Sequence, residues 1–331
     1  MFSIENRRYI GSKTELSTWI LELIQQNCAG NSFADIFAGT AVISKMASEI
    51  YPEIIINDFL FSNNVIYKAF FEDKKWNIQK VKNYIDTWNK ISPENIYDNY
   101  FSTNFGGKFF NYNDSKIIGA IREDLSKTNA FNEQEQNILL ASLIYSADKI
   151  ANTVGHYEAY FHNKEIPQRF IYNIIKPTPI KNLKIYREDA NILSKKLQAD
   201  IVYIDPPYNS RQYSRFYHVL ENLVQWKKPV LEGIALKPPA ENMSEFCRTN
   251  APNIFKNLID NLQCKFIAVS YNNTYNSKSS SSKNKISLEQ IEEILGAKGK
   301  TTRYEHKHKF FNSGKTDFND HKEFLFITEV N

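Results

Sequence analysis

Cysteine is scarce in this sequence. The three cysteines, Cys28, Cys247 and Cys264, lie far apart, and none belongs to a Cys-x-x-Cys pattern or to a Cys/His pattern with the spacing of zinc ligands. These absences indicate neither a disulfide framework nor a zinc site, so no metal is expected. Cysteines without such a pattern suit a reducing compartment, and we expect a cytoplasmic protein.

Long apolar runs are absent as well. No run approaches the roughly 18 apolar residues of a membrane span, and no signal-peptide pattern opens the chain. We therefore expect a soluble protein with no membrane partner. A large excess of charge of one sign is also missing, because 41 Lys and Arg face 37 Asp and Glu and leave a formal charge of +4. This balance permits a polyanionic partner without requiring one.

The glycine-rich motifs that bind phosphate in many nucleotide-binding proteins are missing too. Residues 32–44 predict a strand that turns through Gly39 into a helix, but with neither Walker spacing nor the dinucleotide pattern Gly-x-Gly-x-x-Gly. This disfavours ATP and nicotinamide cofactors. Small residues here let the backbone approach a ligand closely, and Asp35 at the strand tip can accept hydrogen bonds from an ammonium or hydroxyl group. A nucleoside-type ligand is expected at this turn.

The 331 residues suffice for one large α/β domain with a sizeable insertion. Residues 53–59 predict a second strand, which ends at Asp58 about 20 residues after the glycine turn, where nucleotide-binding α/β folds place a ribose-binding carboxylate. A helix N-cap or a loop acid is the alternative for Asp58. Further strands are predicted at residues 185–191, which end at Asp189 and Ala190, and at residues 265–272.

Residues from about Leu60 to Pro179 change character and predict a mainly helical insertion. Within it, a long helix at residues 131–150 is expected to be capped by Asn132, with acidic residues in its first turn. The polar and aromatic segment that follows contains His156 and His162. These histidines could contact a ligand, or the segment could simply pack one lobe on the other, which we favour for its aromatic residues.

The sequence Asp205-Pro206-Pro207-Tyr208 follows a buried strand at residues 200–204. Neither proline can donate a hydrogen bond to a sheet ladder, so the strand should stop abruptly in a stiff turn. The carboxyl ends of strands in open parallel sheets are where α/β proteins place their chemistry. An ordinary strand-ending turn that happens to contain Pro-Pro is the alternative, since short motifs recur by accident.

Both ends of the chain carry basic groups. Residues 7–13 predict a loop that feeds a helix, and Gly11 beside a hydroxyl and Lys13 can hold an anionic group there, or can lie on a solvated surface. Residues 274–285 are rich in Ser, Lys and Asn and predict a mobile loop. Strands at 303–309 and 323–327, connected through 312–315, predict a β-hairpin whose basic groups can touch phosphate.

Taken in order, Tyr9-Ile10-Gly11-Ser12-Lys13, Asp35-Ile36-Phe37-Ala38-Gly39-Thr40, Asn57-Asp58 and Asp205-Pro206-Pro207-Tyr208 resemble the amino-methyltransferases of DNA. The order is similar to that of the Dam-like alpha group, adenine-specific enzymes of type II restriction-modification systems. The resemblance spans nearly the whole chain, and the ordered set is far more specific than any one member. One departure is Ala41, where the family commonly carries another glycine, and we expect negative φ there.

The resemblance implies a doubly wound, seven-stranded Rossmann-like sheet that binds S-adenosylmethionine, with a helical target-recognition insertion and a C-terminal β-hairpin. The catalytic domain is expected at residues 1–60 and 180–331, and the insertion at 61–179. The implied reaction transfers a methyl group from S-adenosylmethionine to the exocyclic amine of an adenine flipped out of double-stranded DNA. The implied partner is a restriction endonuclease against which the methylation protects, and the chain should act as a monomer or weak dimer.

Residue roles follow from the same resemblance. Catalysis is assigned to Asp205, Pro206, Pro207 and Tyr208: the Asp205 carboxylate and the Pro206 carbonyl accept hydrogen bonds from the amine, and Tyr208 stacks on the flipped base. Cofactor contacts are expected from Tyr9, Gly11, Lys13, Asp35, Phe37, Gly39, Thr40, Asp58, Phe59, Asp189, Ala190 and Asp205. DNA contacts are expected from Arg211, Tyr213, Arg215, Lys307 and Lys309.

Three alternatives stay open at the level of the sequence. The same scaffold can methylate the exocyclic amine of cytosine, since pocket size decides between the bases. A DNA-binding relative that has lost catalysis is disfavoured by the intact Asp205 and Tyr208. Methylation of RNA or of protein glutamine is disfavoured by the aspartate in the first position and by the basic C-terminal hairpin.

Overall fold

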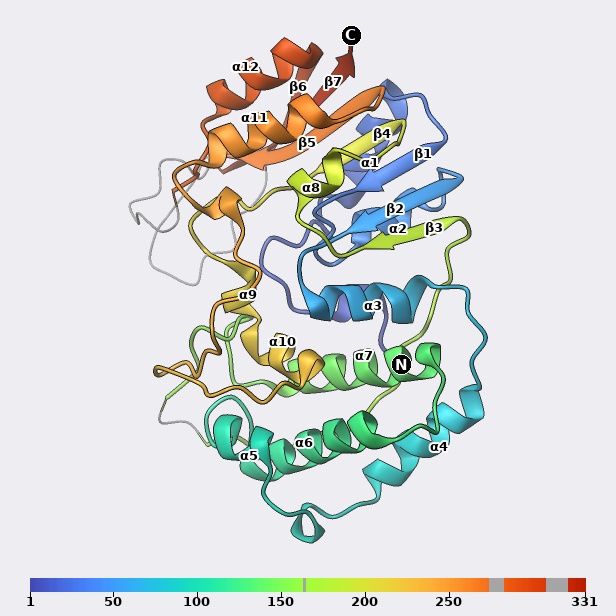
Figure 1. The fold of residues 1–331 in the computed structure, drawn as a ribbon, viewed down its shortest axis with the longest axis vertical. Helices are drawn as coiled ribbons and strands as arrows, with labels where there is room; N and C mark the ends of the chain where they lie inside the picture. Colours follow the sequence, from blue (N-terminus) through green and yellow to red (C-terminus); the bar gives the residue numbers. More distant parts are fainter. Residues whose placement is uncertain (163–164, 274–282, 308–320) are drawn as a thin grey trace. The chain divides into compact units, whose positions relative to one another are not determined.

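The computed structural model describes residues 1–162, 165–273, 283–307 and 321–331, and the chain forms two compact units (Figure 1). We call them the helical unit and the sheet unit. The helical unit comprises Met1–Gly11, Leu60–Ile180 and Tyr213–Glu241. The sheet unit comprises Ser12–Phe59, Lys181–Gln212 and Asn242–Asn331. Each unit is described by itself below.

The sheet unit contains one sheet of seven strands in the order β3-β2-β1-β4-β5-β7-β6. The strands are β1 Ser32–Asp35, β2 Glu53–Asn57, β3 Leu183–Tyr186, β4 Ile201–Ile204, β5 Phe266–Asn272, β6 Gly299–Lys307 and β7 Lys322–Val330. Neighbours from β3 to β5 run parallel, whereas β7 runs antiparallel to both β5 and β6. The predicted seven-stranded α/β sheet is confirmed, and so is the antiparallel pairing of the last two strands. The predicted 312–315 connection between these strands lies outside the described residues.

The parallel strands β1, β2, β4 and β5 are largely buried, which explains their apolar runs, whereas β3 is only partly buried. All four residues of β4 are buried, as are the three isoleucines of β2. The carboxyl ends of β1, β2 and β3 are tied together by the Asn57 side chain: its amide nitrogen donates to the carbonyls of Ile36 (3.0 Å) and Glu188 (3.1 Å), and its oxygen accepts from the Glu188 amide (3.0 Å). These hydrogen bonds hold the ends of the three strands together at the edge of the sheet that carries the predicted site.

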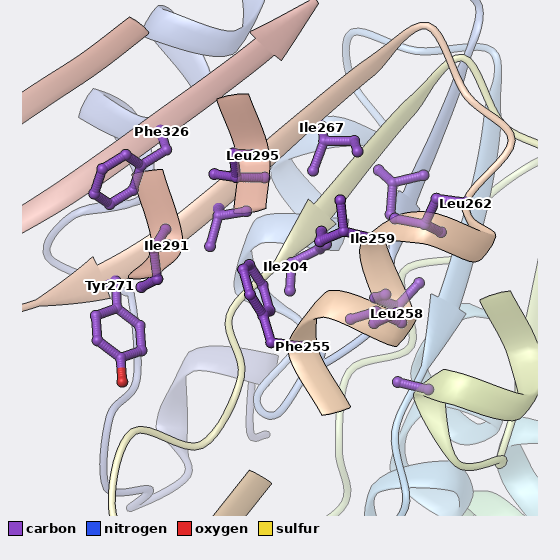
Figure 2. Close-up of a cluster of buried hydrophobic side chains, with 14 of the residues drawn as sticks. Ile204, Phe255, Leu258, Ile259, Leu262, Ile267, Tyr271, Ile291, Leu295 and Phe326 are labelled. Atoms are coloured by element: carbon purple, nitrogen blue, oxygen red, sulfur yellow. The ribbon is translucent and has the colours of Figure 1, made fainter. Parts of the chain in front are cut away.

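Helices cover both faces of this sheet (Figure 1). The helices of the sheet unit are α1 Ser17–Asn27, α2 Val42–Ala47, α8 Ala190–Ser194, α11 Ala251–Asn261 and α12 Leu288–Lys298. α8, α11 and α12 contribute to the apolar cluster on one face, and α1 and α2 pack on the other. Figure 2 shows Phe255, Leu258 and Ile259 of α11 packed against strand residues such as Ile204. This helical spacing places one apolar stripe of α11 on the sheet, although neither α11 nor α12 was predicted.

The helical unit contains no regular strand among the residues that the structure describes. Its α-helices are α3 Phe61–Phe71, α4 Ile78–Asn89, α5 Tyr100–Phe105, α6 Tyr112–Lys127, α7 Glu133–Ile150, α9 Tyr213–Phe216 and α10 His218–Gln225. The predicted cap of α7 is confirmed: the Asn132 side chain accepts from the Glu135 amide (2.9 Å), and the Glu135 carboxylate accepts from the Asn132 amide (3.0 Å). Across the described ranges, no helix combines the length and apolar character needed to cross a membrane.

The two compact units begin and end at other residues than the predicted domains, which were placed at 1–60 with 180–331 and at 61–179. Residues 1–11 belong to the helical unit, because Phe2 exchanges backbone hydrogen bonds with Ile174 (3.0 Å) and Lys176 (2.8 Å). Residues 213–241 belong there as well, because Arg122 donates to two carbonyls at the end of α10 (2.6 and 2.9 Å). The sequence pattern did not contain these long-range contacts.

The predicted strand at residues 185–191 is wrong at its end. β3 stops at Tyr186, and the Asp189 side chain accepts hydrogen bonds from the amides of Asn191 (2.9 Å) and Ile192 (3.3 Å). Asp189 is therefore the N-cap of α8, and capping competes successfully with strand extension.

Two isoleucines of the sheet unit test the assigned core. Ile259 on α11 is fully buried, whereas Ile192 on α8 is 59% exposed. We expect Ile259→Ala to lower the free energy of unfolding by about 2–5 kcal/mol, because it removes apolar contacts and leaves a cavity. The matched control Ile192→Ala should change it by less than about 0.5 kcal/mol. Urea unfolding followed by circular dichroism measures both, and equal losses would contradict the assigned core.

Candidate active site

The carboxyl ends of neighbouring strands bring the predicted acidic residues to one edge of the sheet. Asp35 ends β1, and Asp205 directly follows β4, its parallel neighbour in the sheet. β5 ends at Asn272 on the other side of β4. Because β7 runs antiparallel, its first residues lie beside this end, and Glu323 pairs with Asn272. An acid from the last strand of the chain therefore joins the edge that carries Asp205.

A buried lysine connects these groups. The Lys13 ammonium donates a hydrogen bond to the Tyr208 hydroxyl (2.7 Å), lies 3.2 Å from Asp205 Oδ1 and lies 3.8 Å from Glu323 Oε2. The Tyr208 hydroxyl in turn donates to the same Asp205 Oδ1. The side chains of Lys13 and Glu323 are 8% and 9% exposed, and that of Asp205 is 16% exposed. We call Lys13, Asp205, Tyr208 and Glu323 the Lys13 network.

The charges of this network follow from burial and from its partners. Burial disfavours the ammonium of Lys13, but the carboxylates of Asp205 and Glu323 outweigh it and raise the pKa of Lys13. Burial raises the pKa of Asp205 in spite of Lys13 and Tyr208. For Glu323, burial is opposed and outweighed by Lys13 and His321, which lower its pKa. Lys13 is therefore cationic, and Glu323 is the more readily ionised of its two carboxylates.

Tyr208 stays a neutral phenol in this environment. Burial and then the Asp205 carboxylate raise the pKa of Tyr208 well above its usual range. Its ring packs edge-on against Tyr271, with 4.7 Å between ring centroids. The structure thus joins two of the residues predicted to be catalytic, Asp205 and Tyr208, through one hydrogen bond, and adds Lys13, which the sequence assigned to the cofactor.

Asp35 is a buried carboxylate with one oxygen unused. Its Oδ2 accepts a hydrogen bond from the Ser44 hydroxyl (2.7 Å), whereas Oδ1 has no hydrogen-bond partner in the described part of the chain. Burial raises the pKa of Asp35 to about 7; the charges of Asp205 and Asp58 add to this, and the Ser44 hydrogen bond opposes it. A buried acid with an unused oxygen suits a cation, so Asp35 fits the ammonium group of an amino-acid-bearing cofactor.

The turn after β1 is held by Asp58. The Gly39 amide donates to Asp58 Oδ2 (3.0 Å), and Gly39 adopts the left-handed conformation with φ 53°. Ala41 also adopts it, with φ 58°, so the predicted negative φ at this position is wrong. The Ala41 amide closes the turn onto the Ala38 carbonyl (2.6 Å) directly before α2. An alanine pays about 1–2 kcal/mol for this conformation, and the closed turn outweighs that cost.

The remaining cofactor candidates of the sheet unit lie around the same edge. Phe37 and Phe59 are half-buried, and the Phe37 ring packs edge-on against Phe246 at 5.1 Å. Thr40 is buried in the turn. Ala190 is buried as the first residue of α8, which Asp189 caps.

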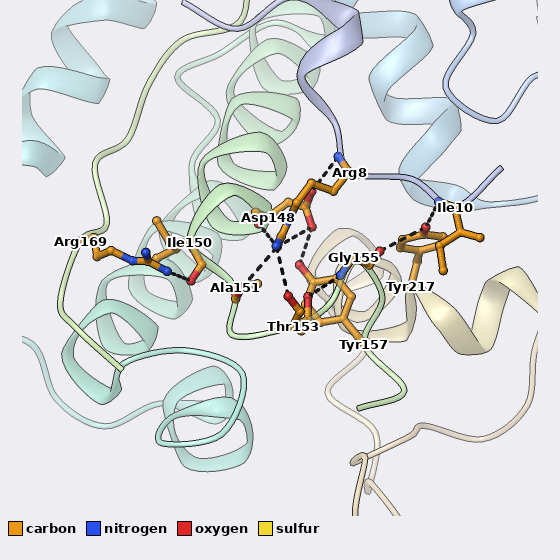
Figure 3. A network of polar contacts seen from close by, with 10 residues as sticks. All are labelled: Arg8, Ile10, Asp148, Ile150, Ala151, Thr153, Gly155, Tyr157, Arg169 and Tyr217. Carbon is orange, nitrogen blue, oxygen red and sulfur yellow. Dashed lines mark hydrogen bonds and ion pairs between the residues drawn. The ribbon is translucent and has the colours of Figure 1, made fainter. Parts of the chain in front are cut away.

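Tyr9 and Gly11 lie in the helical unit, where aromatic rings hold this segment. The Tyr9 ring stacks on those of Tyr217 (4.8 Å) and Tyr213 (5.3 Å), and Gly11 is left-handed with φ 78°. Figure 3 shows the Ile10 amide, which donates to the Tyr217 hydroxyl (2.8 Å).

Figure 3 also shows the contacts of Arg8, the residue before Tyr9. Arg8 forms an ion pair with Asp148 of α7 (3.6 Å), and Asp148 also accepts a hydrogen bond from the Tyr157 hydroxyl (2.9 Å). The first predicted motif is thus anchored on its amino side by the helical unit.

The residues predicted to contact DNA differ in their exposure and in their contacts within the protein. Arg211 is exposed, and so is Lys307 at the end of β6. Arg215 donates to the Pro238 carbonyl (2.7 Å), and Tyr213 is stacked on Tyr9. Lys309 lies outside the described residues.

The two histidines after α7 pack within the helical unit. His156 stacks on Phe216 at 4.7 Å, and the ring of His162 lies 4.5 Å from that of Tyr160. These contacts lie within the helical unit and test neither a ligand contact of the histidines nor the packing of one lobe on the other.

Comparison with known proteins decides the family. The model of the D12 class of N6 adenine-specific DNA methyltransferases matches residues 9–294. This chain belongs to that family. The methyltransferase therefore uses S-adenosylmethionine as methyl donor and DNA as substrate. The family decides for the adenine amine over the cytosine amine, which confirms the predicted resemblance, enzyme class and cofactor.

Several type II methyltransferases are similar to it. It is 29% identical to M.NlaIII of Neisseria lactamica, over 97% of this chain and 98% of that protein. It is 31% identical to M.CviAII of Paramecium bursaria Chlorella virus 1, with the same coverage of both chains. It is 32% identical to M.FokI of Planomicrobium okeanokoites over 90% of this chain, but it spans only 48% of that longer protein. The relatives place the enzyme in the context of restriction-modification.

Glu323 is the member of the Lys13 network that sequence reasoning missed. It was assigned only to a hairpin strand, although its position at the start of that strand carried a usable signal. A strand that pairs antiparallel with the last parallel strand brings its amino end to the catalytic edge. An acid at that end is therefore a candidate for the site.

The raised pKa of Asp35 predicts a pH dependence of stability. The folded protein retains a proton on Asp35 up to a pH of about 7, whereas the unfolded chain releases it near pH ~4. Without ligand, this residue should therefore make the free energy of unfolding fall as the pH rises from about 4 to about 7, by up to about 1.4 kcal/mol per pH unit.

Asp35→Asn should remove this part of the pH dependence. Urea unfolding of both proteins at a series of pH values measures the difference between them. Parallel curves for wild type and variant would contradict the assignment of a buried, unpaired carboxyl group at Asp35.

Proposed function

We propose that this methyltransferase acts on an adenine flipped out of double-stranded DNA, with Asp205, Pro206, Pro207 and Tyr208 as its catalytic residues. The observation that carries the proposal is the buried Lys13 network, in which Asp205 and Tyr208 share a hydrogen bond directly after β4. The position is the carboxyl end of a central parallel strand, which is where this fold class places its chemistry.

The chemistry requires acceptors for the amine. The lone pair of an exocyclic amine is delocalised into the purine ring and must be localised before the nitrogen attacks. Asp205 accepts one hydrogen bond from the amine, and the carbonyl of Pro206 accepts the other, which favours a tetrahedral nitrogen. Because the proton is lost after transfer, no strong base is required, and positioning of the amine supplies much of the acceleration.

Tyr208 holds the base in this scheme. A base turned out of the duplex costs a few kcal/mol of stacking and pairing, and an aromatic ring recovers part of that cost. When the amine takes its place on Asp205, the Tyr208 hydroxyl gives up its own hydrogen bond to that carboxylate. The Tyr208 ring is then free to face the base.

S-adenosylmethionine supplies a methyl group on a sulfonium centre. Its ammonium group fits Asp35, whose buried Oδ1 has no other partner in the described residues. Asp58 would bind the ribose hydroxyls, and the Gly39-Thr40 turn that it supports would lie against the amino-acid part. Phe37 and Phe59 would contact the adenine or methionine part, and Asp189 and Ala190 the adenine edge. Tyr9 and Gly11 complete the proposed set.

Target recognition is proposed for the helical segment 61–179. Phosphate contacts are proposed for Arg211, Tyr213, Arg215, Lys307 and Lys309, of which Arg211 and Lys307 are exposed. Because relatives over the full length are type II methyltransferases, we infer that the methylation protects the target site of a restriction endonuclease. The enzyme would act in the cytoplasm as a monomer or weak dimer.

Removal of the Asp205 carboxylate tests the catalytic assignment. Asp205→Ala should lower the rate of methyl transfer into DNA by at least about 10²-fold, because the amine loses its charged acceptor. Asp260→Ala, which removes an exposed carboxylate paired with Lys256 on α11, is the control and should retain the wild-type rate. Incorporation of labelled methyl groups from S-adenosylmethionine measures both rates. An Asp205→Ala enzyme as fast as wild type would remove Asp205 from the mechanism.

The modified base and its context can be determined in one experiment. Single-molecule sequencing of DNA from cells that express this chain should show N6-methyladenine within one short recurring sequence, because the helical segment selects the target. N4-methylcytosine, or methyladenine without a common context, would contradict the proposed target selection. Cells that express Asp205→Ala provide the unmodified control.

A further inference from the structure

We propose that Glu323 is a positioning residue for methyl transfer: it acts as the counter-ion of Lys13 and so leaves the negative charge of Asp205 to the target amine. The inference rests on the proposed function and adds a residue to it. Glu323 is the first acid of β7, and its carboxylate is nearly buried. Lys13 lies between Glu323 and the proposed catalytic residue Asp205.

The geometry places Lys13 between two acids. Its ammonium is 3.2 Å from Asp205 Oδ1 and 3.8 Å from Glu323 Oε2. Glu323 Oε2 has no hydrogen-bond partner among the described residues, so it can receive the ammonium. The other oxygen, Oε1, lies 3.3 Å from Nε2 of the buried His321, which holds the carboxylate in place.

The charge balance of the network gives Glu323 its role. One ammonium and two carboxylates leave one net negative charge in the Lys13 network. Without Glu323, Lys13 and Asp205 would form a neutral pair, and the ammonium would compete with the target amine for the same oxygen.

The reaction makes that competition worse, because the attacking nitrogen gains positive charge as it takes up the methyl group. A neighbouring ammonium repels that charge, whereas a free Asp205 carboxylate stabilises it. A shift of Lys13 from Asp205 to Glu323 on target binding satisfies both requirements. Glu323 then has a role in the chemical step and none in cofactor or DNA binding.

Glu323→Gln tests the inference because it removes the charge and keeps the shape. We expect the single-turnover rate of methyl transfer to fall by about tenfold to a hundredfold, a range typical of coupled neighbouring charges. The dissociation constants of S-adenosylmethionine and DNA should stay within about twofold, since Glu323 itself contacts neither the cofactor nor the DNA in the proposed function. Glu305→Gln, which removes an exposed β6 carboxylate paired with Lys322, is the matched control and should keep the wild-type rate.

A double substitution separates this role from a merely structural one. In a Lys13→Gln background there is no ammonium to draw away from Asp205, so a further Glu323→Gln should change the rate by less than about threefold. Glu323→Asp, which retains the charge, should be faster than Glu323→Gln. Circular dichroism and urea unfolding of each variant establish that it is folded.

Three outcomes would overturn the inference. They are a wild-type rate for Glu323→Gln, an equal loss with and without Lys13, and a loss that appears as weaker S-adenosylmethionine binding. Failure of the proposed function is distinguishable, because it appears as methyl transfer by Asp205→Ala. An inactive Asp205→Ala together with a fully active Glu323→Gln overturns the role of Glu323 alone.

Discussion

A buried ammonium between two carboxylates is the interaction on which the proposed active site depends. Lys13 contributes it from the segment before α1, Asp205 from the end of β4 and Glu323 from the start of β7. These three positions are far apart in the sequence, and only the sheet order brings them together. An unpaired charge in this environment would be costly, so each member stabilises the position of the others. The catalytic edge is therefore a property of the whole sheet.

Several features that depend on neighbours in the sequence were predictable, although the N-cap at Asp189 was not. The two prolines after β4 end that strand at the position where Asp205 is needed, and Asn132 with Glu135 marks the start of α7. The buried strands β1, β2, β4 and β5 follow from short apolar segments of the right length. The limits of the two compact units depend on distant contacts. Residues 1–11 and 213–241 join the helical unit through hydrogen bonds that no local pattern contains.

The residues of the proposed site also differ in whether the local sequence or a distant strand pairing places them there. Asp35, Asp58 and Asp205 were predicted because each stands at the end of a predicted strand or directly after it. Glu323 was not predicted, because its position beside Lys13 depends on the antiparallel register of β7 against β5. The φ angle of Ala41 was mispredicted for another reason. A residue other than glycine disfavours the left-handed conformation by only about 1–2 kcal/mol, and the hydrogen-bonded turn before α2 outweighs that cost.

The proposed contact of Asp35 with the cofactor ammonium would link cofactor binding to proton exchange with the solvent. A carboxyl group with a pKa of about 7 is only partly ionised at neutral pH. A cation bound to its unused oxygen favours the ionised form, so uptake of the cofactor would be accompanied by release of a fraction of a proton. The observed heat of cofactor binding would then depend on the ionisation enthalpy of the buffer. Acidity of the medium would weaken that binding without any change in the shape of the site.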